Sequence, residues 1–124
     1  AFEAALEIAP DKTEARYHLA DVLKDLQEFK RAILEYRRII QQQPERVGAY
    51  HNLGAVLLSQ NLPAEALPIL RKTVELDGRN FNAWILLGLT HQQLGNPKDA
   101  RKAYQQVLTL DPQNAVARAR LQDL

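Results

Sequence analysis

Apolar and small side chains recur along the chain at steps of three and four residues, the spacing of one α-helical face. In the stretch 81–94, Ala83, Leu87 and His91 keep this spacing. Residues 95–97, Gly-Asn-Pro, interrupt it with a glycine suited to a left-handed helix end, an N-cap residue and a first-turn proline. A second apolar series then runs to Leu108, before an Asp-Pro pair. The pattern predicts two helices joined by a tight turn.

The same arrangement returns every 34 residues, so positions 34 apart are called equivalent below. Two columns keep one residue type at all four of their equivalent positions. They are Leu19, Leu53, Leu87 and Leu121, and Ala15, Ala49, Ala83 and Ala117. A period of this length, with small residues at fixed positions, predicts pairs of antiparallel helices that stack into a solenoid.

These columns resemble the tetratricopeptide repeat family. The unit Phe81 to Asn114 carries that family's pattern most fully, at Trp84, Leu87, Gly88, Ala100, Tyr104 and Pro112. The other units depart from it: Leu70 replaces the second-helix aromatic, Gly78 replaces the closing proline, and Arg16 stands where the first aromatic belongs. The resemblance implies an all-α, right-handed α-solenoid of helix-turn-helix repeats, and it says little about function.

The expected units are three complete repeats with a partial repeat at each end. Residues 13–46, 47–80 and 81–114 form the complete repeats. Residues 1–12 match a second helix, since Phe2 and Ala5 are equivalent to Tyr36 and Ile39, and residues 115–124 match a following first helix or a capping helix. We therefore expect a piece of a longer array whose truncated terminal helices allow self-association between copies.

Composition narrows the classes of function. The 124 residues are 46% hydrophobic and 25% charged, which is typical of a globular domain. Sixteen basic and fifteen acidic residues leave a net charge of +1, so no nucleic-acid partner is expected. No apolar run approaches 18 residues, so no membrane insertion is expected either. The absence of cysteine excludes disulfides and thiolate metal sites without indicating a compartment.

No catalytic motif is present, so the chain is not expected to be an enzyme or to bind a cofactor. His91 is equivalent to large inward-facing residues of the family and is interpreted as a packing residue. His18, His51 and Asp21 would face one side and could together bind a transition metal. We favour solvated groove residues, because no close histidine pair anchors such a site, and predict no metal.

The resemblance implies that the first helices line a concave groove, which holds a peptide or helix of a protein partner. The groove residues carried over by equivalence are Tyr17, His18, Asp21, His51, Asn52, Leu58, Asn82, Ile85, Leu86 and Leu89. Their character changes from charged at the N-terminal end to apolar at the C-terminal end.

One subclass of the family clamps the C-terminal carboxylate of chaperones with lysine, arginine and asparagine side chains. The equivalent residues here are Tyr17, Asp21, Asn52, Asn82 and Leu86. Only Asn52 matches, and Asp21 would repel a carboxylate, so an adaptor for chaperone tails is not expected.

The sequence therefore predicts a non-catalytic protein-protein interaction scaffold. The alternative is a docking or regulatory arm of a larger enzyme, or of an envelope or secretion assembly protein, whose active domain lies outside these residues. Gln-rich repeats without methionine favour a bacterial source. The residues leave the partner open, as well as the choice between cytoplasm and periplasm.

Overall fold

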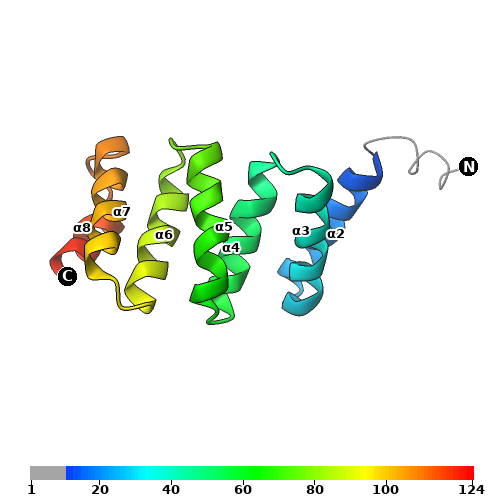
Figure 1. The fold of residues 1–124 in the computed structure, drawn as a ribbon, viewed down its shortest axis with the longest axis horizontal. Coiled ribbons are helices and arrows are strands. Elements are labelled where there is room, and N and C mark those ends of the chain that lie inside the picture. The colour runs from blue at the N-terminus through cyan, green and yellow to red at the C-terminus, as the bar shows by residue number, and fades with distance from the viewer. Residues whose placement is uncertain (1–10) are drawn as a thin grey trace, which may run out of the picture.

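The computed structural model describes residues 11–124, and over this range it contains seven α-helices and no strand. Figure 1 shows them standing side by side in one row. They are α2 (Asp11–Asp25), α3 (Phe29–Gln42), α4 (Val47–Ser59), α5 (Pro63–Leu76), α6 (Phe81–Gln93), α7 (Pro97–Leu110) and α8 (Ala115–Gln122). The expected all-α solenoid is confirmed. The expectations for Phe2 and Ala5 lie outside the described residues.

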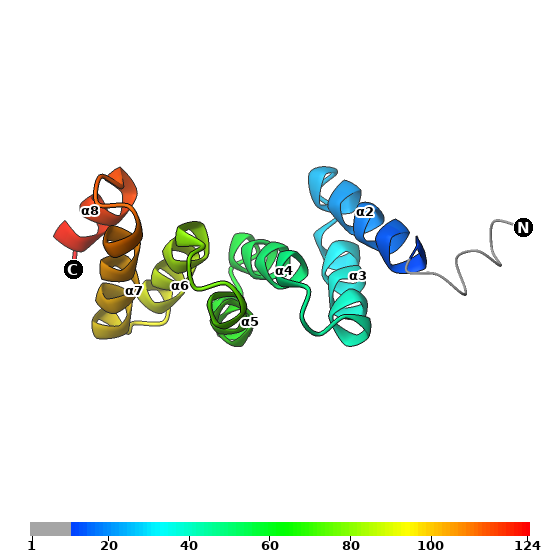
Figure 2. The ribbon, with the colours of Figure 1, turned by 90° about the horizontal axis from the view of Figure 1, so that it is seen from above.

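Each helix packs chiefly against its neighbours in sequence, α2 on α3 and so on to α7 on α8. Seen from above, α2, α4, α6 and α8 lie along one side of the row, and α3, α5 and α7 lie along the other (Figure 2). Burial therefore depends mainly on helices adjacent in sequence, with a smaller contact between the successive first helices α4 and α6, as in other solenoids. None of the helices in residues 11–124 combines the length and the apolar character needed to cross a bilayer.

The turn inside each helix pair is built in the same way. Gln27, Asn61 and Gly95 are equivalent, and their φ angles are +61°, +60° and +77°. This left-handed conformation ends the first helix of each pair. Pro63 and Pro97 then occupy the first turns of α5 and α7. Glycine predicted the turn at Gly95, whereas nothing in the residue type predicted it at Gln27.

Side-chain capping differs from the expectation in one respect. Asn96 is the N-cap residue of α7, but its side chain makes no capping hydrogen bond. The asparagines that cap are Asn80 and Asn114, which precede α6 and α8 and accept from the backbone N–H of Ala83 and Ala117. These first helices therefore begin at fixed points.

The small column on the first helices lies beneath large side chains of the second helices. A Cβ atom added at Gly54 would lie 2.5 Å from Leu70 Cδ2, and one at Gly88 would lie 2.6 Å from Tyr104 Cε1. Leu70 and Tyr104 are both fully buried. The glycines therefore make room for the side chains that join the two helices of each pair.

The leucine column differs in burial from one repeat to the next. Leu53 and Leu87 are 0% and 5% exposed, whereas Leu19 is 43% exposed. The reason is positional, because α4 and α6 each pack on a preceding helix, while no described helix precedes α2. At the other end, Val116 on α8 is also exposed. Self-association through these ends stays a prediction.

Candidate functional site

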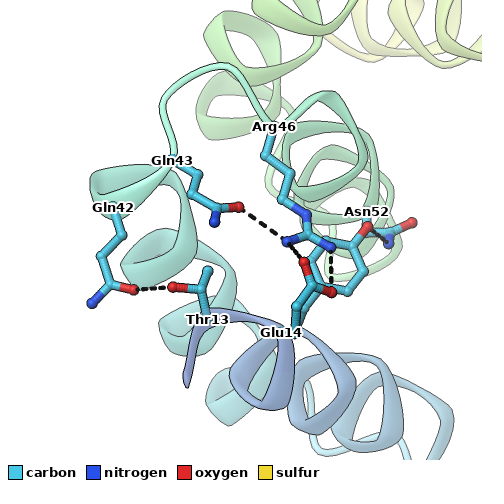
Figure 3. A network of polar contacts seen from close by, with 7 residues as sticks. Thr13, Glu14, Gln42, Gln43, Arg46 and Asn52 are labelled. Atoms are coloured by element: carbon cyan, nitrogen blue, oxygen red, sulfur yellow. Dashed lines mark hydrogen bonds and ion pairs between the residues drawn. The ribbon is translucent and has the colours of Figure 1, made fainter. Parts of the chain in front are cut away.

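The first contact between repeats, called the first joint, centres on Arg46 in the turn before α4 (Figure 3). Its guanidinium forms a two-pronged ion pair with Glu14 of α2, in which Nη2 donates to Oε2 at 3.0 Å. The guanidinium carbon also lies 4.1 Å from the centroid of the Tyr17 ring. The hydrogen bond from Arg46 lowers the pKa of the Glu14 carboxyl. Planar Arg–carboxylate pairing of this kind fixes geometry as well as charge.

The same joint continues inward through Asn52 of α4. Its Nδ2 donates to the Tyr17 hydroxyl at 3.1 Å and to Asp21 Oδ1 at 3.3 Å. The Tyr36 hydroxyl donates to the same carboxylate oxygen, and the rings of Tyr17 and Tyr36 meet edge to face with centroids 6.1 Å apart. Burial, reinforced by the Asp21 charge, raises the pKa of Tyr17. Three of the predicted groove residues are thus brought together as a hydrogen-bonded unit.

Gly48 makes the position of Tyr17 available. A Cβ atom at Gly48 would lie 2.4 Å from the Tyr17 hydroxyl oxygen, too close for any side chain while the tyrosine stays in place. The equivalent residues are Glu14 and Asn82, which both have side chains. Gly48 was absent from the predicted groove set. A glycine at this position in a helix could have indicated that another side chain occupies the space beside it.

The second joint, one repeat further on, uses different residues at equivalent positions. His51 replaces Tyr17, and Asn80 replaces Arg46. His51 Nδ1 lies 3.1 Å from Asn80 Nδ2, and Asn80 Oδ1 accepts from the backbone N–H of Ala83 at 3.2 Å. Burial, followed by the charge of Lys24, lowers the pKa of His51. The histidine is therefore held neutral at physiological pH.

A hollow of about 260 Å³ lies between the two joints. None of the residues lining it carries a formal charge at neutral pH. They are Tyr17, Val47, Gly48, His51, Asn52, Asn80 and Asn82. Four belong to the predicted groove set, whereas Val47, Gly48 and Asn80 were missed. Polar atoms that can both donate and accept hydrogen bonds make this hollow a candidate binding site.

The apolar residues of the predicted groove are less exposed to solvent than the sequence suggested. Leu58, Ile85 and Leu86 are half-buried and pack against the core clusters. Leu89 is also half-buried and belongs to neither cluster. It is equivalent to Asp21, so it offers an apolar side chain where the first repeat offers a carboxylate.

The histidines do not gather around a common point. His18 is exposed, His51 is engaged with Asn80, and Asp21 accepts from Tyr36 and Asn52. Within residues 11–124, no three histidine, cysteine, aspartate or glutamate side chains are grouped closely enough to hold a metal ion. His91 is 5% exposed, as its interpretation as a packing residue requires.

Comparison with known proteins identifies relatives over most of the chain. Three sequence models described as tetratricopeptide repeat match residues 1–57, 46–76 and 81–114. The human protein O-mannosyl-transferase TMTC3 is 30% identical over 115 residues, which make up 91% of this chain and 13% of that protein. The chain thus spans about an eighth of this relative's length.

Solved structures share the fold. MamA from Desulfovibrio magneticus RS-1 has 27% identity and a TM-score of 0.84, covering 88% of this chain and 62% of that one. The first tetratricopeptide repeat domain of Spaghetti (RPAP3), bound to the HSP90 peptide SRMEEVD, has 20% identity and a TM-score of 0.86. The match covers 94% of this chain and 92% of that one.

Proposed function

Because this chain belongs to the tetratricopeptide repeat family, we propose that it binds an extended segment of a protein partner across α2, α4 and α6. As a solenoid of this family it is a protein-interaction scaffold, and the proposal concerns where and how it binds. The observation that carries it is the uncharged hollow between the two joints, with the half-buried Leu89 further along. The structural relative that binds an HSP90 peptide supports a peptide as the occupant.

The chemistry of the groove separates this chain from a reader of chaperone tails. Asp21 stands at a position that the carboxylate-clamping subclass fills with a residue able to bind a carboxylate. Its Oδ1 already accepts hydrogen bonds from Asn52 and Tyr36. We propose that the partner segment approaches with uncharged polar and apolar side chains rather than with a terminal carboxylate.

The test uses Leu89→Glu, because Leu86 packs against the core and its replacement would also destabilise the fold. Peptides are selected from a random display library on the immobilised protein, and the best binder is measured by fluorescence anisotropy. We expect Leu89→Glu to weaken binding by about tenfold or more, since apolar anchors carry much of an interface's energy.

The control is Gln105→Glu, which adds the same charge at an exposed position of α7. It is expected to leave the affinity unchanged. An affinity that Leu89→Glu leaves intact, in a variant whose circular dichroism matches the parent, would show that the peptide binds elsewhere.

A second proposal is that these repeats form the docking or regulatory arm of a larger enzyme. The similarity to a human O-mannosyl-transferase favours it, although that similarity concerns only 13% of the relative's length. An antibody against residues 47–80 tests the idea on the native source. A polypeptide much larger than 124 residues, with a catalytic domain identified by mass spectrometry, is the expected result, and a band of this chain's own size would refute it.

A further inference from the structure

The orientation of the Asn52 side chain is fixed by an unambiguous partner. Its amide contacts Asp21 Oδ1 at 3.3 Å, and an ionised carboxylate can only accept a hydrogen bond. The nitrogen of the amide must therefore face Asp21, which leaves Oδ1 as the outward acceptor. No donor from residues 11–124 forms a hydrogen bond with this oxygen.

The tautomer of His51 is fixed by a similar chain of contacts. The backbone N–H of Ala83 can only donate, so the atom of Asn80 that caps α6 must be its oxygen. The NH₂ group of Asn80 then faces His51 and donates, which requires Nδ1 of the ring to be unprotonated. The proton of the neutral ring is therefore on Nε2, and no described residue accepts it.

Adjacent residues of α4 thus present one fixed donor and one fixed acceptor, and both residues line the same uncharged hollow. A side-chain carboxamide matches this pair, because its C=O accepts from a donor while its NH₂ donates to an acceptor. A carboxylate has no proton for Asn52 Oδ1, and an ammonium has no acceptor for His51 Nε2–H. We propose that the hollow is a specificity subsite for an asparagine or glutamine side chain of the partner segment.

This inference rests on the proposed function and adds the chemistry that selects the segment. The ion pair of Glu14 with Arg46 closes one side of the joint, so a charged side chain of the partner finds no unpaired counter-ion there. The Tyr17 hydroxyl accepts from Asn52 and retains its own proton, which gives a second donor at the edge of the hollow. Both features favour a neutral polar group over a charged one.

The first measurement needs no ligand. The ring ¹⁵N chemical shifts of His51 in the free protein distinguish its tautomers, and at pH 7.5 we expect the Nε2–H form. In Asn80→Asp, the aspartate still caps α6, because both residue types are good N-caps. The carboxylate, however, can only accept a hydrogen bond, so it favours a proton on Nδ1 of His51. The ¹⁵N shifts should therefore change to those of the Nδ1–H or the doubly protonated ring. An Nδ1–H ring in the parent protein would overturn the proposal.

The second measurement uses the peptide selected for the groove. Versions that carry glutamine, glutamate or lysine at the selected position are compared by calorimetry, and glutamine is expected to bind about tenfold more tightly than either. Where Asn80→Asp gives the Nδ1–H ring, Nε2 no longer donates, so the glutamine peptide should bind more weakly. Where it gives the doubly protonated ring, the added positive charge should let glutamate compete with glutamine. Asn114→Asp makes the same exchange at the cap of α8, away from the hollow, and should leave both affinities unchanged.

The outcomes separate this inference from the proposed function. If peptides bind and Leu89→Glu weakens them, but glutamate or lysine serves as well as glutamine, the carboxamide subsite is wrong and the groove stands. If the library yields no binder, the proposed function fails and this inference fails with it. If the ring shifts change in Asn80→Asp but both peptides bind as tightly as they do to the parent protein, the role of His51 is wrong.

Discussion

The contact between α6 and α7 depends on the absence of a side chain at Gly88, so we expect Gly88→Ala to destabilise the fold. The added Cβ would lie 2.6, 2.7 and 3.0 Å from Cε1, Cζ and Cδ1 of Tyr104. The first distance is roughly 1 Å shorter than an optimal contact between carbon atoms. The ring cannot easily move, because it is fully buried and its hydroxyl donates to Gln92 Oε1.

Two opposing effects set the size of the change. Overpacking of this kind costs about 1–3 kcal/mol, while alanine is more favourable than glycine inside a helix by about 0.5–1 kcal/mol. The net expectation is a loss of about 1–2 kcal/mol in the free energy of unfolding. Urea denaturation followed by circular dichroism measures it.

The control for this prediction is Gly78→Ala. A Cβ atom at Gly78 would meet only the backbone oxygen of Val74, at 3.4 Å, and the residue is exposed. We expect little change there. If Gly88→Ala is as stable as the parent, the two helices are separable at low cost and the packing argument is wrong.

Two further stability changes follow from particular residues. Gln27→Gly should raise the free energy of unfolding by about 1 kcal/mol, because a left-handed conformation costs an ordinary L-residue roughly that much; urea denaturation that shows no gain would contradict this. His91→Leu should flatten the fall in stability on acidification. Burial lowers the pKa of His91 below its usual 6.5, so the unfolded chain gains a proton first as the pH falls through that value, and native stability is lost. Equal pH profiles between 5 and 8 would refute it.

The helices and most of the turns could be predicted because their signals are local. Spacing of apolar residues, glycine and proline each act within a few residues of the chain. The residue type of Gln27 does not predict its left-handed conformation, which is imposed by the two helices that it joins. The repeat itself held a further clue, because Gln27 is equivalent to Gly95.

Arg16 illustrates a departure from the family pattern that has a structural partner. In place of an aromatic ring, its Nη1 donates to Glu35 Oε2 at 3.1 Å, and Glu35 is buried. Glu35 also accepts from Arg38 at 3.0 Å. The residues equivalent to Glu35 are Ile69 and Ala103, so a charge stands in an apolar column. The sequence therefore shows a charged residue in an aromatic column and another in an apolar column. Only the fold shows that these two residues contact each other.

The groove was predicted by position, while its chemistry depends on contacts between repeats. Tyr17, Asp21 and Asn52 were all predicted, yet their hydrogen bonds join residues 31 to 35 apart. The two residues that organise the joints, Arg46 and Asn80, lie in turns before the helices. A search restricted to first helices could not find them. Turn residues reach the first helices only because of the way in which successive repeats pack, and the sequence does not show that packing.

The columns of equivalent positions differ in how much their residue type varies between repeats. Some buried columns keep one residue type, as at Ala32, Ala66 and Ala100, because each residue fills the same space against a neighbouring helix. The groove column changes from Asp21, which accepts from Tyr36 and Asn52, to Ala55 and then to Leu89. A partner segment lying along the first helices would meet the polar hollow at α2 and α4, and then an apolar side chain on α6. Because these two surfaces differ, a segment could satisfy both in one direction only, so the array would fix the orientation of its partner as well as its identity.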